Sequence, residues 1–151
     1  MNLWAIFEQL EQALTQVPDV RPYIGLQEDV LTSSATATAV VIRPGEPYIA
    51  DYHAAMSGGQ ARVNVVLEIV LPRTSMRSAQ LRLAELLSSG DGESRSIIDT
   101  LRAYDRPNDL SGEVCDFKFG QVSGINDRTV GAGDYLGVDM DIEVLVRRTL
   151  T

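Results

Sequence analysis

The chain has 151 residues, of which 44% are hydrophobic and 23% are charged, and these values fit one globular domain with its own core. The formal net charge of -8 and the pI of about 4.5 argue against a protein that grips nucleic acid, because phosphate affinity comes from clustered Lys and Arg. No apolar run approaches the roughly 20 residues of a membrane span, and the first residues show no basic segment, so we expect a cytoplasmic protein without a signal peptide.

The N-terminal segment predicts an amphipathic helix. Apolar residues recur at helical spacing from Leu3 to Val17, and the helix should end before Pro18. A connector follows, with a short strand around Val20 to Leu26. The β-branched segment Thr36 to Pro44 predicts a strand that stops at Pro44-Gly45.

Residues 44–60 (PGEPYIADYHAAMSGGQ) are predicted to form a long loop or arm. Long loops in compact domains usually carry function, and Tyr and Met are typical of contact surfaces. We therefore interpret Tyr48, Tyr52, His53 and Met56 as candidate contacts to a subunit or partner. The alternative is an extra hairpin that only covers the sheet.

The middle of the chain changes from a period of two to helical spacing. Strict alternation predicts a strand over 61–72, with apolar side chains on one face: Val63, Val65, Leu67, Ile69 and Leu71. Helices are predicted over 78–89, with Ser78 as the N-cap, and over 93–104. A turn-rich loop over 105–112, a strand over 113–124 and a loop over 125–134 complete this part.

The last strand shows the clearest pattern. Six alternate positions from Leu136 to Val146 are apolar, while the other face carries Asp139, Asp141, Glu143 and Arg147. The order α-β-β-α-(α)-β-β predicts a single α+β domain over 1–151. Its sheet should be mixed or mainly antiparallel, with about four to five strands and helices packed on one face.

Several motifs in the sequence suggest chemistry, and each has a simpler interpretation. Gly131, Gly133 and Gly137 precede a strand, whereas a phosphate-binding loop opens a helix. Cys115 lacks the basic neighbours that activate a thiolate. His53 could form a triad on paper with Asp51 and Ser57, but no Gly-x-Ser-x-Gly elbow supports one. We predict no catalytic and no cofactor-binding residues.

The acidic residues of the last strand could suggest a metal site. Neighbouring side chains on one strand face lie roughly 6.6 Å apart, so adjacent carboxylates would need further ligands to hold one cation. We predict no metal site and interpret Asp139, Asp141, Glu143 and Arg147 as a contact or solvent-facing strip. The enzyme alternative is a small metal-dependent protein that also uses His53.

The chain resembles the tail terminator proteins of long-tailed, non-contractile bacteriophages, with tail-completion and neck proteins as near neighbours. The resemblance rests on the N-terminal helix, TAVVIRPGEPYIADYH, ARVNVVLEIVLPR, the helical segment SAQLRLAELLSSGDGESRSIIDTLRAY, and GDYLGVDMDIEVLV. Tyr135 and Gly137 supply the Y-x-G step into the final strand that is common in this group.

The resemblance implies structural work without catalysis or cofactors. Terminator subunits form a hexameric ring that caps the tail tube, stops its polymerisation and joins the head-completion or neck protein, and DNA passes through the opening. Six copies at -8 each give a formal charge of -48, which would repel DNA. Loops over 105–112 and 123–134 could meet the two partners. The alternative within virion assembly is a head–tail connector.

Overall fold

The computed structural model describes residues 3–25, 38–50, 60–72, 76–88, 96–103, 113–130 and 133–148. The elements in chain order are α1 (Leu3–Leu14), β1 (Val20–Ile24), β2 (Thr38–Ala50), β3 (Gln60–Pro72), α3 (Met76–Leu87), α4 (Ile97–Ala103), β4 (Glu113–Val130) and β5 (Gly133–Arg148).

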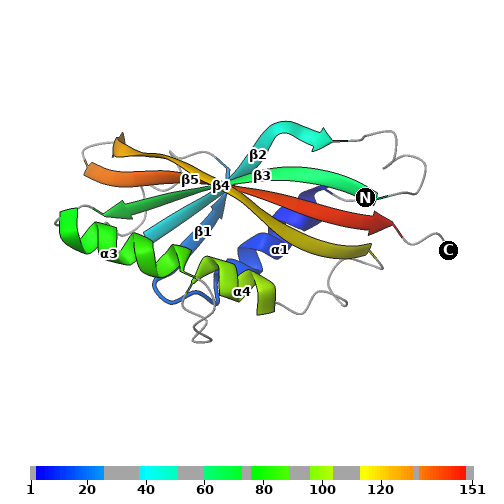
Figure 1. The fold of residues 1–151 in the computed structure, drawn as a ribbon, viewed down its shortest axis with the longest axis horizontal. Coiled ribbons are helices and arrows are strands. Elements are labelled where there is room, and N and C mark those ends of the chain that lie inside the picture. Colours follow the sequence, from blue (N-terminus) through cyan, green and yellow to red (C-terminus); the bar gives the residue numbers. More distant parts are fainter. Residues whose placement is uncertain are drawn as a thin grey trace.

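The strands form one sheet in the order β1-β2-β3-β5-β4. Strand β1 pairs parallel with β2, and the other pairs are antiparallel, so the sheet is mixed. The described helices lie together on one side of this strongly twisted sheet (Figure 1). The α+β class, the strand number and the placing of the helices are confirmed.

The core lies between the helices and the sheet, and every second residue of the central strands points into it. Every second residue of β3 from Val63 to Leu71 is at most 1% exposed, and the matching positions of β5 from Leu136 to Val144 are at most 4% exposed. Helix α1 adds Ile6, Leu10 and Leu14 to the same cluster. The period of two in the sequence therefore identified the buried face of both central strands.

Helix α1 ends close to the predicted place, and a tight connection leads into β1. The backbone N–H of Val17 donates to the carbonyl of Leu14, and Asp19 adopts a positive φ of 59°. Asp tolerates this left-handed conformation better than most residues. The guanidinium of Arg82 on α3 donates to the carbonyl of Pro18, which ties the connection to the helical layer.

The first turns of the other helices differ from the prediction. Helix α3 begins at Met76, so Ser78 lies inside the helix and is not its N-cap. Helix α4 begins at Ile97, later than predicted. Its cap is Ser96, which is buried and whose Oγ accepts a hydrogen bond of 3.0 Å from the backbone N–H of Asp99.

The prediction that the second strand stops at Pro44-Gly45 and that a loop begins there is wrong. Strand β2 continues to Ala50, and residues 51–59 lie outside the described part of the chain. Pro44 pairs with Val65 and Ile49 pairs with Val63, so five steps along β2 face two along β3. This irregular bulge holds three extra residues of β2. The strand can therefore contain two prolines and a glycine and still continue beyond them.

The predicted loop over 125–134 is also wrong for most of its length. Strand β4 runs to Val130 and β5 begins at Gly133. Two register shifts, between Phe119 and Val122 and between Ser123 and Asn126, each add one residue to β4. Glycine and polar residues that favour turns therefore occupy bulges of a long edge strand. The loop predicted over 105–112 lies outside the described residues.

Candidate functional site

The face of the sheet that points away from the helices, called here the outer face, carries the candidate site. Residues 139, 141 and 143 alternate with buried core residues of β5, so their side chains share this face as predicted. In the register of the sheet, Asp139 lies opposite Glu68, Asp141 opposite Val66, and Glu143 opposite Asn64. Five of these six side chains are polar or charged, and Val66 is the exception.

A bridging arginine binds both carboxylates of the first opposed pair. The Nη2 atom of Arg43 on β2 lies 3.0 Å from Glu68 Oε2 and 3.0 Å from Asp139 Oδ1. Glu68 is only 6% exposed, whereas the side chains of Arg43 and Asp139 are 41% and 30% exposed. A buried carboxylate opposite a second carboxylate requires such a cation, because charge burial without a partner is costly.

Glu143 has a longer and more exposed ion pair. Its Oε1 lies 3.7 Å from the Nε of Arg62, whose side chain is 54% exposed. Such a pair contributes little to stability because solvent screens it. Arg147 pairs through its backbone with Gln60 and Val114, at the end of the same strand.

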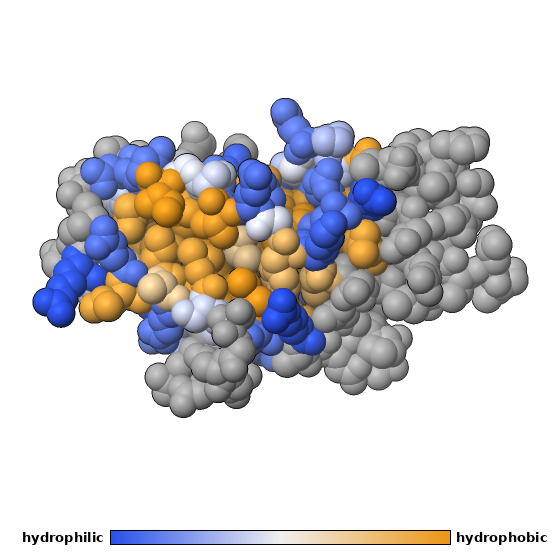
Figure 2. All heavy atoms as spheres, in the orientation of Figure 1, coloured by the Kyte–Doolittle hydropathy of each residue, from blue (hydrophilic) through white to orange (hydrophobic). Residues whose placement is uncertain are grey.

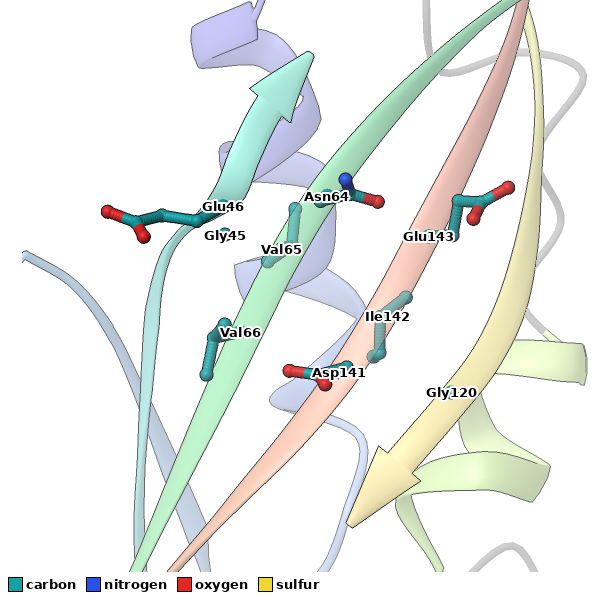
Figure 3. A pocket seen from close by; sticks show the side chains of 9 residues that line it. All are labelled: Gly45, Glu46, Asn64, Val65, Val66, Gly120, Asp141, Ile142 and Glu143. Carbon is teal, nitrogen blue, oxygen red and sulfur yellow. The ribbon is translucent and has the colours of Figure 1, made fainter. Parts of the chain in front are cut away.

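A groove crosses the outer face between the two bulged strands. It has a volume of about 220 Å³ and is lined by Gly45, Glu46, Asn64, Val65, Val66, Gly120, Asp141, Ile142 and Glu143. Its residues come from β2, β3, β5 and β4 (Figure 3). The carboxylate of Asp141 points toward β3, that of Glu143 points toward β4, and that of Glu46 points away from both strands.

Two glycines shape this groove by letting neighbouring strands come close. A Cβ on Gly45 would lie 3.0 Å from the Cβ of Asn64 and 3.1 Å from its backbone carbonyl. A Cβ on Gly120 would lie 3.2 Å from the backbone oxygen of Asp141. The amide of Asn64 also donates a hydrogen bond of 2.7 Å to the carbonyl of Pro47, which closes the β2 bulge.

Tyr48, a predicted contact residue, lies in the β2 bulge and packs inside the molecule. Its ring meets that of Phe7 on α1 edge to face, with centroids 6.1 Å apart and an interplanar angle of 71°. The ring is half-buried, and this burial raises the pKa of the Tyr48 hydroxyl above its usual 10.0. The remaining candidates of the arm, Tyr52, His53 and Met56, lie outside the described residues.

The outer face is not uniformly polar. Ala39, Val41 and Val70 are at most 4% exposed, although they belong to the face opposite the main core cluster. The sequence analysis predicted a contact or solvent-facing strip only for the polar residues of the last strand. The acidic groove therefore occupies one part of the outer face, beside a buried apolar part.

Among the residues that the structure describes, no three His, Cys, Asp or Glu side chains come together as a metal could require. The same part of the chain contains no helix that is both long and apolar enough to cross a membrane.

The sequence pattern identified the carboxylates of β5. It missed Arg43, Glu68 and the two glycines, because their partners follow only from the register of neighbouring strands.

No protein-family model matches the chain, and no curated protein is significantly similar to it.

Proposed function

We propose that the chain is a structural virion protein that forms a ring on the end of a bacteriophage tail tube. The ring ends tube polymerisation and provides the surface that joins the tail to the head or neck. Its partners are further copies of the chain, the tail tube protein and a head-completion protein. DNA passes through the ring without specific binding, and the protein acts without catalysis at the head-proximal end of the tail.

The observation that carries this proposal is the charge of the outer face. Asp141 is exposed in an open groove and forms no ion pair among the described residues, and the whole chain has a net charge of -8. A surface of this kind repels phosphate, so it suits a passage that DNA must traverse without sticking. A catalytic site would instead bring polar groups together, whereas the carboxylates of this groove point apart (Figure 3).

The order of elements supports the same proposal. The described parts of the segments that carry the resemblance to tail terminators fold as α1, as the β2–β3 pair, as the helices α3 and α4, and as the final strand β5. The two edges of the sheet, β1 and β4, differ in length and chemistry. Ring closure needs such different surfaces, because each copy must dock one patch on another patch of its neighbour.

A head–tail connector is the second candidate within virion assembly, since it would use the same acidic passage. A metal-dependent enzyme is less well supported, because the Arg43 guanidinium already holds Asp139 and would oppose a metal cation there. The phenotype of phage that lack the protein distinguishes a terminator from a connector. Overlong tails indicate a terminator, whereas tails of normal length that fail to join heads indicate a connector.

A further inference from the structure

The only tryptophan of the chain lies on an exposed part of α1. Trp4 is 59% exposed. Glu8, one helical turn further on, is also exposed and shares the same side of the helix. Helix α1 contains two glutamates and no basic residue. Trp4 and Glu8 together are called here the α1 ridge.

A surface of complementary chemistry lies along β4. Val122 and Ile125 are 39% and 61% exposed, although Val122 stands opposite Met140 on the core side of the sheet. Next to them, the guanidinium of Arg102 on α4 lies 5.6 Å from the centre of the Phe119 ring. These four residues, called here the β4 strip, combine apolar area with an exposed positive charge.

Figure 2 shows how hydrophobic and hydrophilic side chains are distributed on one face of the molecule. In this view hydrophobic side chains form a continuous area between the β4–β5 hairpin and α3, with hydrophilic side chains around it. Aromatic residues and Arg are the side chains most often found at the energetic centre of a protein interface. Exposed apolar area rimmed by polar residues marks a contact surface.

We propose that the β4 strip receives the α1 ridge of a second copy of this chain. The indole of Trp4 packs on Val122 and Ile125, and the carboxylate of Glu8 lies beside Arg102. Copies that each carry a charge of -8 repel one another, so a contact between them must place a cation against an acidic patch. The α1 ridge is acidic, whereas the charged group of the β4 strip is a guanidinium.

The two patches are made of different residues, as a heterologous contact requires. The α1 ridge lies on α1, which packs against β1, β2 and α4, whereas the β4 strip lies on β4 and α4. Phe119, which lies beneath Arg102, and Val122 are no more than about 10 Å apart along β4. Side chains of Trp4 and Glu8, one helical turn apart on α1, can therefore reach both ends of this distance.

This inference rests on the proposed ring and specifies one of its contacts. Because Trp4 is the only tryptophan, its fluorescence reports directly on the contact. We expect assembly of the full chain, followed by light scattering, to shift the Trp4 emission to shorter wavelength and to reduce acrylamide quenching. Trp4→Ala should weaken self-association about 30-fold or more, as expected for a buried interface anchor.

Charge reversal gives a second test that a misfolded variant cannot imitate. Glu8→Lys and Arg102→Glu should each weaken self-association about tenfold, and the double variant should recover much of the loss. Arg77→Glu is the matched control, because Arg77 is exposed on α3 outside both patches. Circular dichroism should show that all four proteins keep the wild-type fold.

The outcomes separate this contact from the proposed function. Rings that form without any change in Trp4 emission, or a double variant as weak as the sum of its single changes, would overturn the contact and leave the ring intact. A chain that never self-associates, alone or on tail tubes, would overturn both.

Discussion

Arg43 on β2 and Asp139 on β5 form an ion pair of 3.0 Å although β3 lies between their strands. The same Nη2 atom is 3.0 Å from Glu68 on β3, so one guanidinium joins three adjacent strands. Glu68 is nearly buried and depends on this cation. The contact fixes one end of the acidic outer face and leaves Asp141 exposed in the groove.

Replacing the bridging arginine should destabilise the fold. Arg43→Met keeps the apolar stem but leaves Glu68 buried opposite Asp139 without the guanidinium, and we expect a loss of about 2–4 kcal/mol in the free energy of unfolding. Urea denaturation measures this loss. Arg62→Met is the matched control, because its ion pair is longer and more exposed, and it should change stability by less than about 1 kcal/mol. Equal losses in both variants would contradict the role given to Arg43.

The groove should be sensitive to one added methyl group. Gly45→Ala places a Cβ 3.0 Å from the Asn64 side chain and 3.1 Å from its backbone, so the two strands must move apart. We expect a loss of about 1–3 kcal/mol, as for other overpacked sites. Gly120→Ala meets its nearest atom at 3.2 Å and should cost less. Thermal unfolding of both variants ranks them, and the reverse order would be inconsistent with the described packing.

Tyr48 should make stability depend on alkaline pH. Its pKa is raised by burial, so the folded chain holds the phenolic proton to higher pH than the unfolded chain does. As pH rises, Tyr48 ionises first in the unfolded chain. The free energy of unfolding therefore falls above about pH 10, whereas this group does not change it at lower pH. Tyr48→Phe keeps the edge-to-face contact with Phe7 and should show a smaller alkaline decline than wild type. Identical declines in denaturation experiments between pH 9 and 11 would refute this assignment.

The cap of α4 should contribute measurably to stability. Ser96→Ala removes the acceptor for the backbone N–H of Asp99 at a buried position, and we expect a loss of about 1 kcal/mol. Ser88→Ala is the control, because the Ser88 hydroxyl donates to the carbonyl of Ala84 at the exposed end of α3. Chemical denaturation should show a smaller effect for this control, and no difference between them would contradict the cap.

The metal-dependent alternative predicts a different result for the acidic strip. If the groove bound Mg²⁺, Mn²⁺ or Ca²⁺, calorimetry would show saturable heat that Asp141→Asn abolishes. The structural proposal predicts no saturable heat for the wild-type chain with any of the three cations. A micromolar site lost in the Asp141 variant would restore the enzyme alternative.

The sequence predicted those parts of the fold whose signal is local. The alternation in β3 and β5 and the helical spacing of α1 each identify a buried face without knowledge of partners. Prediction failed where a strand carries residues typical of turns: Pro44 to Ala50 and Ile125 to Val130 were predicted as loops but extend β2 and β4. Bulges make this possible, and a bulge depends on the neighbouring strand, which the sequence of one segment does not contain.

The candidate site was predicted in the same partial way. The period of two placed Asp139, Asp141 and Glu143 on one face, but it could not distinguish their environments. Pairing with β3 brings Glu68 opposite Asp139, and pairing of β3 with β2 brings Arg43 within reach. The resulting Arg43–Asp139 contact joins residues 96 positions apart, so the division into an end bridged by arginine and an acidic groove follows only from the sheet register.

The central proposal is that the chain caps a tail tube as a ring. Its most direct test is electron microscopy of tubes polymerised from the tail tube protein of the same phage, with and without this chain. We predict ring density at one end of each tube and tubes that stop growing once it is present. Tubes that grow equally long in both samples, with bare ends, would contradict the proposal.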